Sequence, residues 1–223
     1  MEEKMKFKID ESLKNKVSLG ITVIDFENQS YDKKMWDELL NPIDEKISHE
    51  DTLETIRENP TIMNTKKVYK ELGKDPARFR PSSDSLWRRV VKGKGLYQIN
   101  SLVDLNNYLS LVYKLPFGSY DLDKVAGDIV LTLGKPGETY NGIGKKTINL
   151  ENMLLLKDED GPFGGPTSDS TRAMIGDNTR SAVIVAYIFG VDRLDTEKIQ
   201  SSISMYAKKY LKDITIKEQQ IIQ

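Results

Sequence analysis

Residues 181–189 constrain the fold most, because the run Ser-Ala-Val-Ile-Val-Ala-Tyr-Ile-Phe is apolar almost throughout. A strand with one face in water alternates apolar and polar residues, whereas a strand covered on both faces reads as a continuous apolar run. We therefore predict a strand here that is buried on both faces. Residues 17–23 alternate apolar with small or polar residues, which is typical of a half-buried strand.

Helical patterns dominate the first half of the chain, and strand patterns cluster in the second half. Amphipathic spacing predicts helices over residues 31–40, 43–59, 65–72 and 82–91 and a fifth from residue 101. Ser82 or Ser83 would cap the fourth helix, and Ser101 with Asp104 resembles a capping box for the fifth.

Strand patterns cover residues 127–133, 147–150 and 153–157 and are followed by a glycine-rich loop over 158–176. A last helix begins at Asp195 or Thr196, and residues 214–223 fit either a final strand or a tail. This order predicts the α+β fold class, with mixed β-sheets flanked by helices. We expect residues 1–60 to form an N-terminal extension of a strand and helices, packed on a main domain of residues 61–223.

Several classes of function are excluded by residue content. The chain has no cysteine and a single histidine, His49, which excludes disulfides, thiolate chemistry and a histidine-rich metal site. We expect His49 to lie on the surface, and we predict neither a cofactor nor a metal. The longest apolar run, near residues 182–189, is far shorter than a membrane span, so we predict no membrane association and a cytoplasmic protein.

A net charge of −1 conceals two blocks of opposite sign. Residues 25–58 hold 11 acidic and 4 basic side chains, whereas residues 66–94 hold 10 basic and 3 acidic ones. Two interpretations remain open: the basic block binds a polyanion such as RNA, or it docks on the acidic block of the same chain. The residues that we expect to bind RNA are Arg80, Arg88, Arg89, Lys92 and Lys94.

Two segments combine glycine or proline with small polar side chains. Residues 99–123 join a capped helix to a tight turn, and residues 158–170 contain the pair Gly164-Gly165, which lets a backbone approach a ligand closely. Either segment also fits a purely structural helix and turn. A divalent-cation site on Asp158, Glu159, Asp160 and Asp169 is a weaker alternative, because EF-hand spacing is absent.

The same two segments resemble the B3/B4 domain of bacterial phenylalanyl-tRNA synthetase β subunits. Residues 102–108 read Leu-Val-Asp-Leu-Asn-Asn-Tyr and residues 116–121 read Pro-Phe-Gly-Ser-Tyr-Asp, where the family commonly reads Leu-Val-Asp-x-Thr-Asn-Tyr and Pro-Leu-His-Ala-Phe-Asp. Residues 161–168 resemble the family's Gly-Ile-Met-Gly-Gly-Glu-x-Ser. Because the other synthetase domains are missing, the chain resembles a freestanding member and not a complete tRNA ligase.

This resemblance implies a fold that binds a mischarged tyrosyl group and releases it from tRNA by hydrolysis. The implied substrate-binding residues are Asn106, Asn107, Gly118, Ser119, Gly164, Gly165, Pro166, Thr167 and Ser168. Asn106, Gly118, Ser119 and Pro166 replace the family's threonine, histidine, alanine and glutamate, whereas Asn107 and Ser168 match. A base for hydrolysis would have to be Asp121, Asp169 or the terminal hydroxyl of the tRNA.

Two functions from different classes follow. The first is a trans-acting aminoacyl-tRNA deacylase, with tRNA or aminoacyl-tRNA as its partner and an oxyanion held by the Gly164 and Gly165 amides. The second is a non-catalytic protein that binds an amino acid or another small metabolite in the same pocket. A structural or regulatory partner of a synthetase or ribosome is a third.

Overall fold

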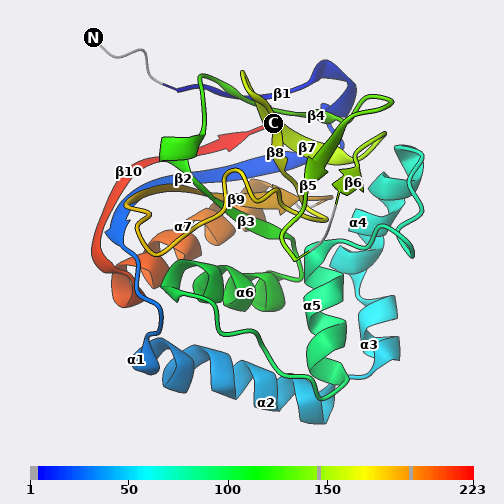
Figure 1. Ribbon diagram of the computed structural model, residues 1–223. Helices are drawn as coiled ribbons and strands as arrows, with labels where there is room; N and C mark the ends of the chain where they lie inside the picture. Colours follow the sequence, from blue (N-terminus) through cyan, green and yellow to red (C-terminus); the bar gives the residue numbers. More distant parts are fainter. Residues whose placement is uncertain (1–4, 145–146, 191–192) are drawn as a thin grey trace.

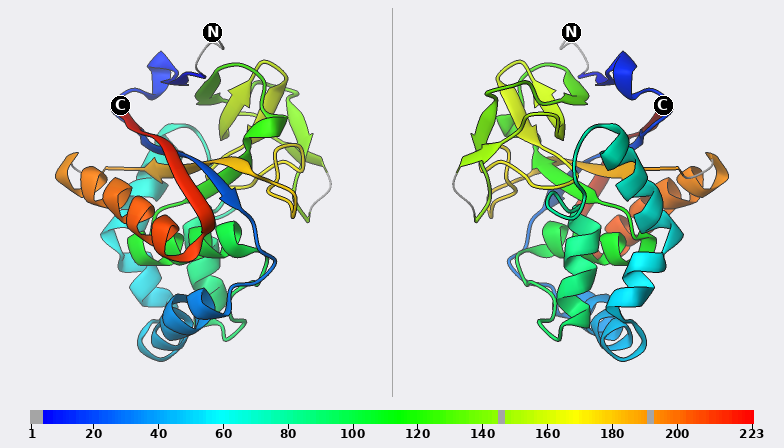
Figure 2. Two further views of the ribbon diagram at one scale, coloured as in Figure 1. Left: turned by 90° about the vertical axis from the view of Figure 1, so that its left-hand side faces the viewer. Right: turned by 90° about the vertical axis from the view of Figure 1, so that its right-hand side faces the viewer.

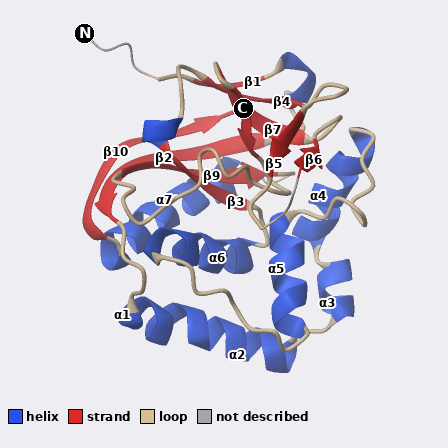
Figure 3. Ribbon diagram, viewed as in Figure 1, coloured by secondary structure: helices blue, strands red, loops and turns tan. Residues whose placement is uncertain are grey.

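The computed structural model describes residues 5–144, 147–190 and 193–223. Within these ranges, ten strands include two sheets of four. Figure 1 shows these two sheets one above the other, with α6 (Ser101–Tyr113) and α7 (Arg193–Tyr210) beneath the lower sheet. A further group of helices lies at the other end of the molecule, and Figure 3 separates this helical part from the strands by colour. The predicted α+β fold class is confirmed.

The lower sheet has the strand order β10 (Lys212–Ile222), β2 (Ser18–Glu27), β9 (Ser181–Ile188), β3 (Phe117–Asp121). Every neighbouring pair in it is antiparallel. β9 lies inside this sheet, with Val183, Ile184 and Val185 fully buried, which confirms the strand predicted from its apolar run. The C-terminal residues form the edge strand β10 and not a tail.

The upper sheet has the order β1 (Phe7–Ile9), β4 (Ile129–Leu133), β7 (Leu154–Asp158), β8 (Gly161–Gly164). A two-stranded ribbon of β5 (Thr139–Asn141) and β6 (Thr147–Asn149) lies beside it. β8 falls within the segment predicted as one long loop. That prediction was wrong there, because Gly161 and Pro162 disrupt the period-two pattern by which a strand is recognised.

The first helical region continues from α1 (Lys33–Met35) through a π-helical turn (Trp36–Leu40) into α2 (Asn41–Glu50). Pro42 lies at the start of α2 and has no backbone N–H to donate, so a wider turn before it accommodates the ring. The helix predicted over 43–59 is divided, because Thr52 accepts from the Glu54 and Thr55 amides and starts α3 (Leu53–Glu58).

Three helices lead towards the site. α4 (Pro60–Glu71) begins at Pro60, with Asn59 as its cap, and α5 (Ser82–Val91) packs against α2 and α6. Neither Ser82 nor Ser83 caps α5, since neither hydroxyl has a hydrogen-bond partner among the described residues. Asn100, and not Ser101, caps α6 by accepting from the Val103 amide.

Residues 1–60 supply strands to both sheets. β1 pairs with β4 in parallel, and β2 is hydrogen-bonded on one edge to β9 and on the other to β10. The strands before residue 60 therefore belong to the same two sheets as strands after it. In the part of the chain that the structure describes, no helix combines the length and apolar character needed to cross a bilayer.

Candidate functional site

One face of α5 borders an open cavity of about 450 Å³. Ser82, Ser85, Leu86 and Arg89 lie at the helical spacing of i, i+3, i+4 and i+7, so their side chains share that face. We call this cavity the basic cleft, and the right-hand view of Figure 2 shows α4 and α5 from the outside. It is lined by Arg80, Ser82, Ser85, Leu86, Arg88, Arg89, Lys92, Lys94, Tyr97, Asn107 and Thr167.

The lining carries positive charge without a matching carboxylate. Five of its side chains are arginine or lysine, and none is aspartate or glutamate. Lys92 and Lys94 are exposed, and their side-chain amines have no hydrogen-bond or ion-pair partner among the described residues. All five residues predicted from the sequence to bind RNA therefore meet in one place.

A single buried carboxylate supports this concentration of cations. Asp84 of α5 is fully buried and lies 2.5 Å from Arg88 Nε, 2.9 Å from Lys66 Nζ and 3.9 Å from Arg80 Nε. One carboxylate thus pairs with three cationic side chains, so the net charge of the site stays positive. Among the described residues no ion pair joins the acidic and basic blocks, which meet through apolar side chains including Ile47, Ile56 and Trp87.

Each of the two segments that the sequence singled out contributes one residue to the lining of the basic cleft. α6 contributes Asn107, and the loop after β8 contributes Thr167, whose Oγ1 lies 2.7 Å from the Tyr69 hydroxyl. This loop is tied to the start of α5 because the Ser82 N–H donates to the Pro166 carbonyl at 2.8 Å. The Ser82 hydroxyl oxygen lies in the same cleft, is itself buried and has no partner among the described residues.

The space between the expected pocket glycines is filled by Tyr120. A Cβ built on Gly118 would lie 2.4 Å from the Tyr120 hydroxyl, and one built on Gly164 would lie 2.2 Å from its ring. The Tyr120 residue is only 1% exposed, and its ring meets Phe163 edge-on. The two glycines are therefore packing positions for a tyrosine between the sheets and do not line the basic cleft.

Asp169 lies beside this tyrosine. Its Oδ1 accepts from the Tyr120 hydroxyl at 2.8 Å and from the Gly165 N–H at 3.1 Å. Burial of the carboxyl group raises the pKa of Asp169 to about 6, although both hydrogen bonds oppose the rise. Since the Tyr120 proton goes to Asp169, Tyr187 is the donor in the 2.7 Å contact between the two tyrosine hydroxyls.

The other predicted residues have separate structural roles. Asp121 accepts from the Thr179 hydroxyl at 2.8 Å and pairs with Lys124 at 3.0 Å, so its carboxylate holds the loop that precedes β9. Ser119 points to the opposite face of β3 from Gly118 and Tyr120, because strand side chains alternate. Asn106 is buried, with its Oδ1 unpaired among the described residues. The Ser168 carbonyl accepts from the Tyr140 hydroxyl at 2.5 Å.

Two of the four acidic residues of the weaker cation-site alternative, Asp158 and Asp169, are otherwise engaged. Asp158 accepts from both terminal nitrogens of Arg172, at 2.9 and 2.8 Å, and this pairing lowers its pKa even though burial opposes the shift. Within residues 5–144, 147–190 and 193–223, no group of three or more potential metal-binding side chains is arranged to hold an ion.

Sequence reasoning missed Ser82, Ser85, Leu86 and Tyr97 as cleft residues. The three α5 residues share a helical face with Arg89, so the spacing that marked the basic residues also indicates them. Tyr97 lies in an irregular segment between α5 and α6, and no local pattern distinguishes it from a core aromatic residue.

Known relatives match the part of the chain that builds this site. Residues 64–218 match the family model of the B3/4 domain, which is more than half of the chain. The chain belongs to the B3/4 domain family.

Curated relatives of this B3/4 domain are phenylalanine–tRNA ligase β subunits. That of Neisseria meningitidis serogroup B is 28% identical over 112 residues, which cover 49% of this chain and 14% of the subunit. That of Paramagnetospirillum magneticum is 38% identical over 86 residues, covering 35% of this chain and 11% of the subunit. The B3/4 domain thus corresponds to a small part of each relative's length.

Among solved structures, an N-terminal fragment of the phenylalanyl-tRNA synthetase β subunit from Pyrococcus horikoshii aligns with 99% of this chain and 51% of its own. The TM-score is 0.46 at 13% identity. The family assignment rests on the family model and not on this superposition.

The contact between Gly164 and Tyr120 leads to a stability prediction. Gly164→Ala should destabilise the B3/4 domain by about 1–3 kcal/mol, because the new methyl group would overlap the tyrosine ring. In a Tyr120→Leu background, where the overlapping ring atoms are gone, most of this cost should disappear. Urea denaturation of the single and double variants measures the difference. Gly176→Ala is the control, since a Cβ there meets nothing within 4 Å, and an equal Gly164→Ala cost in both backgrounds would contradict the contact.

The pKa of Asp169 predicts a pH dependence. Because the folded-state pKa is raised to about 6, the contribution of this group to stability is present at low pH and is lost as pH rises through 6. Between pH 5 and 7 the loss should be on the order of 1 kcal/mol. Asp169→Asn should remove this pH dependence of stability, while Asp177→Asn, at an exposed carboxylate, should retain it. Urea denaturation at a series of pH values tests this, and an unchanged slope in Asp169→Asn would refute it.

Proposed function

We propose that the basic cleft binds the 3′ end of a tRNA and that the protein hydrolyses an aminoacyl ester carried there. The observation that supports this most is the meeting of five cations with Asn107 and Thr167 around one cavity that has no acidic lining residue. The matched relatives are subunits of a ligase whose name includes tRNA, which makes an RNA phosphate the natural anion for this site.

The cations divide into two groups by their existing contacts. Arg80 and Arg88 share Asp84 with Lys66 and are held in place at the cleft wall. The side-chain amines of Lys92 and Lys94 are exposed and have no partner among the described residues, so both are available to phosphate oxygens. Because a polyanion releases condensed counterions when lysines replace them, this binding should weaken steeply as salt is added.

Hydrolysis in this cleft would depend on the substrate's own groups. Water adds to the ester carbonyl carbon, the bond from that carbon to the ribose oxygen breaks, and the ribose hydroxyl leaves with a proton. No imidazole or carboxylate lines the cleft, so the neighbouring hydroxyl of the terminal ribose would relay the proton: it accepts one from the water and passes its own to the departing ribose oxygen. The Asn107 amide and the Thr167 hydroxyl can donate hydrogen bonds to the oxyanion, which is stabilised further by the surrounding positive charge.

A second function is favoured by the same lack of an imidazole or carboxylate in the lining. In this alternative the cleft binds an anionic small metabolite without catalysis, and its volume of about 450 Å³ lies in the usual range for such sites. A metabolite binder should gain thermal stability from a small anion in the absence of RNA, whereas an RNA binder should respond to tRNA.

Salt dependence tests the RNA-binding part of the proposal. Replacing Lys92 or Lys94 with Ala should each reduce the slope of log affinity against log salt by about 0.7 for a single-stranded contact. Fluorescence polarisation with labelled, uncharged tRNA between about 50 and 200 mM KCl measures the slope. Lys208→Ala removes an exposed lysine of α7, outside the cleft, and should leave the slope unchanged. If the Lys92/Lys94 double variant keeps the wild-type slope, tRNA does not bind here.

Release of the amino acid tests the catalytic part. Incubation with a panel of charged tRNAs should release at least one amino acid faster than buffer does. Asn107→Ala should lower kcat by about tenfold or more, as expected for loss of one oxyanion donor, with a smaller change in KM. Asn178→Ala, at an exposed loop position, is the control. If tRNA binds but no charged tRNA is hydrolysed, the catalytic part fails and the binding part stands.

A further inference from the structure

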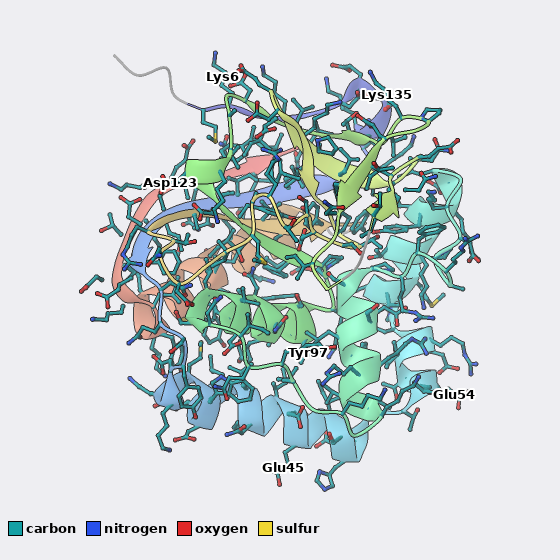
Figure 4. The ribbon with its side chains drawn as sticks, in the orientation of Figure 1. Lys6, Glu45, Glu54, Tyr97, Asp123 and Lys135 are labelled. Atoms are coloured by element: carbon teal, nitrogen blue, oxygen red, sulfur yellow. The ribbon has the colours of Figure 1, made fainter. Side chains whose placement is uncertain are left out.

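Tyr97 is an exposed aromatic residue at the edge of the basic cleft. It lies in the segment between α5 and α6, as Figure 4 shows, and lines the cavity together with Lys92 and Lys94. Half of its surface, 50%, is exposed. A large ring left in water next to unpaired lysines has no role in the core.

The ring is held in a fixed orientation by Arg89. The guanidinium carbon of Arg89 lies 3.8 Å from the ring centroid, so it covers one face of the tyrosine. The Tyr97 hydroxyl accepts a hydrogen bond from Arg89 Nη1 at 3.1 Å. Arg89 thus contacts one ring face, and the residue still keeps half of its surface exposed at the cleft.

Arg89 is in turn held by the backbone. Its Nε donates to the Gly95 carbonyl at 2.8 Å, and Nη2 donates to the Lys94 carbonyl at 3.0 Å. These bonds fix the guanidinium without any ligand, so little side-chain entropy remains to be lost on binding. Arg89 acts here as a support for Tyr97, while Lys92 and Lys94 remain the free cations.

A flat aromatic face beside free cations matches the chemistry of a nucleotide. Lysines take the phosphate, and the aromatic face takes the base, as in proteins that bind single-stranded nucleic acid. We infer that Tyr97 is a stacking platform for an unpaired nucleobase, and that the basic cleft therefore binds a single-stranded RNA end in preference to a duplex. This inference rests on the proposed RNA-binding function and adds the base-contacting residue to it.

The preference for an unpaired end follows from the geometry of stacking. In a duplex both faces of each internal base are covered by its neighbours, whereas a base in a single strand can turn a face to a protein ring. Stacking on an aromatic side chain does not depend on which base is present, because every base has a π-face. The platform should thus distinguish single strands from duplexes but discriminate weakly between sequences.

The test compares three labelled ligands: a single-stranded RNA of about four nucleotides, the same RNA with abasic sites, and a blunt duplex of the same sequence. Tyr97→Ala should weaken binding of the single strand about 5- to 100-fold. It should change binding of the abasic RNA little, because only phosphates remain to be bound. Tyr97→Phe keeps the ring and loses only the hydroxyl contact, so it should retain most of the affinity for the single strand.

Lys92→Ala is the matched control, since it should weaken the base-containing and abasic RNAs by the same factor. If all RNAs bind and Tyr97→Ala weakens the abasic RNA as much as the normal one, stacking is refuted while the proposed function survives. A blunt duplex that binds as tightly as the single strand would also refute it. If no RNA binds to the wild type, the proposed function itself fails.

Discussion

The contact of Tyr120 with Gly118 and Gly164 fills the space where the sequence predicted a ligand pocket. The ring lies between the two sheets, and both glycines approach it so closely that a methyl group on either would overlap it. The hydroxyl is bonded to Asp169, which in turn accepts from the Gly165 amide. Because interiors are packed without spare volume, a tyrosine in this position leaves the outer basic cleft as the open space next to the glycine-bearing loop.

The basic cleft depends on a different device, the buried carboxylate of Asp84. Bringing Lys66, Arg80 and Arg88 together would be opposed by their mutual repulsion, and the fully buried Asp84 offsets it from behind the cleft. Removal of this carboxylate would leave three cations close together with no counter-charge. Since a single carboxylate cannot neutralise three cations, the net charge at the cleft remains positive and suits an anionic ligand.

The sequence predicted the elements far better than the shape of the site. The run at 181–189 predicted β9, and helical spacing predicted α5 with its basic face, because both signals lie within one element. The division of the second helix depended on the hydrogen bonds of Thr52, and the start of α4 on those of Asn59. Such bonds compete locally with a continuous helix, and the apolar pattern alone does not reveal which prevails.

The pocket residues were harder to predict because their arrangement depends on side-chain contacts that no apolar or helical pattern records. Gly118 and Gly164 were expected to line a ligand site. Tyr120, which belongs to the same short motif as Gly118, points between the sheets and fills the space beside both glycines. Tyr97 gave no signal at all, since its role depends on Arg89, which lies eight residues earlier on α5.

The departures of this B3/4 domain from the family pattern are connected through packing. Gly118, at the family's histidine position, and Tyr120, at its phenylalanine position, share one face of β3, and any side chain at 118 would meet the tyrosine. Pro166, at the glutamate position, offers its carbonyl to the Ser82 amide and so joins the glycine-rich loop to the start of α5. The exchanges thus close the inner space while fixing Thr167 at the edge of the basic cleft. The basic cleft that we propose as the binding site offers cations for a phosphate and the exposed Tyr97 for a base.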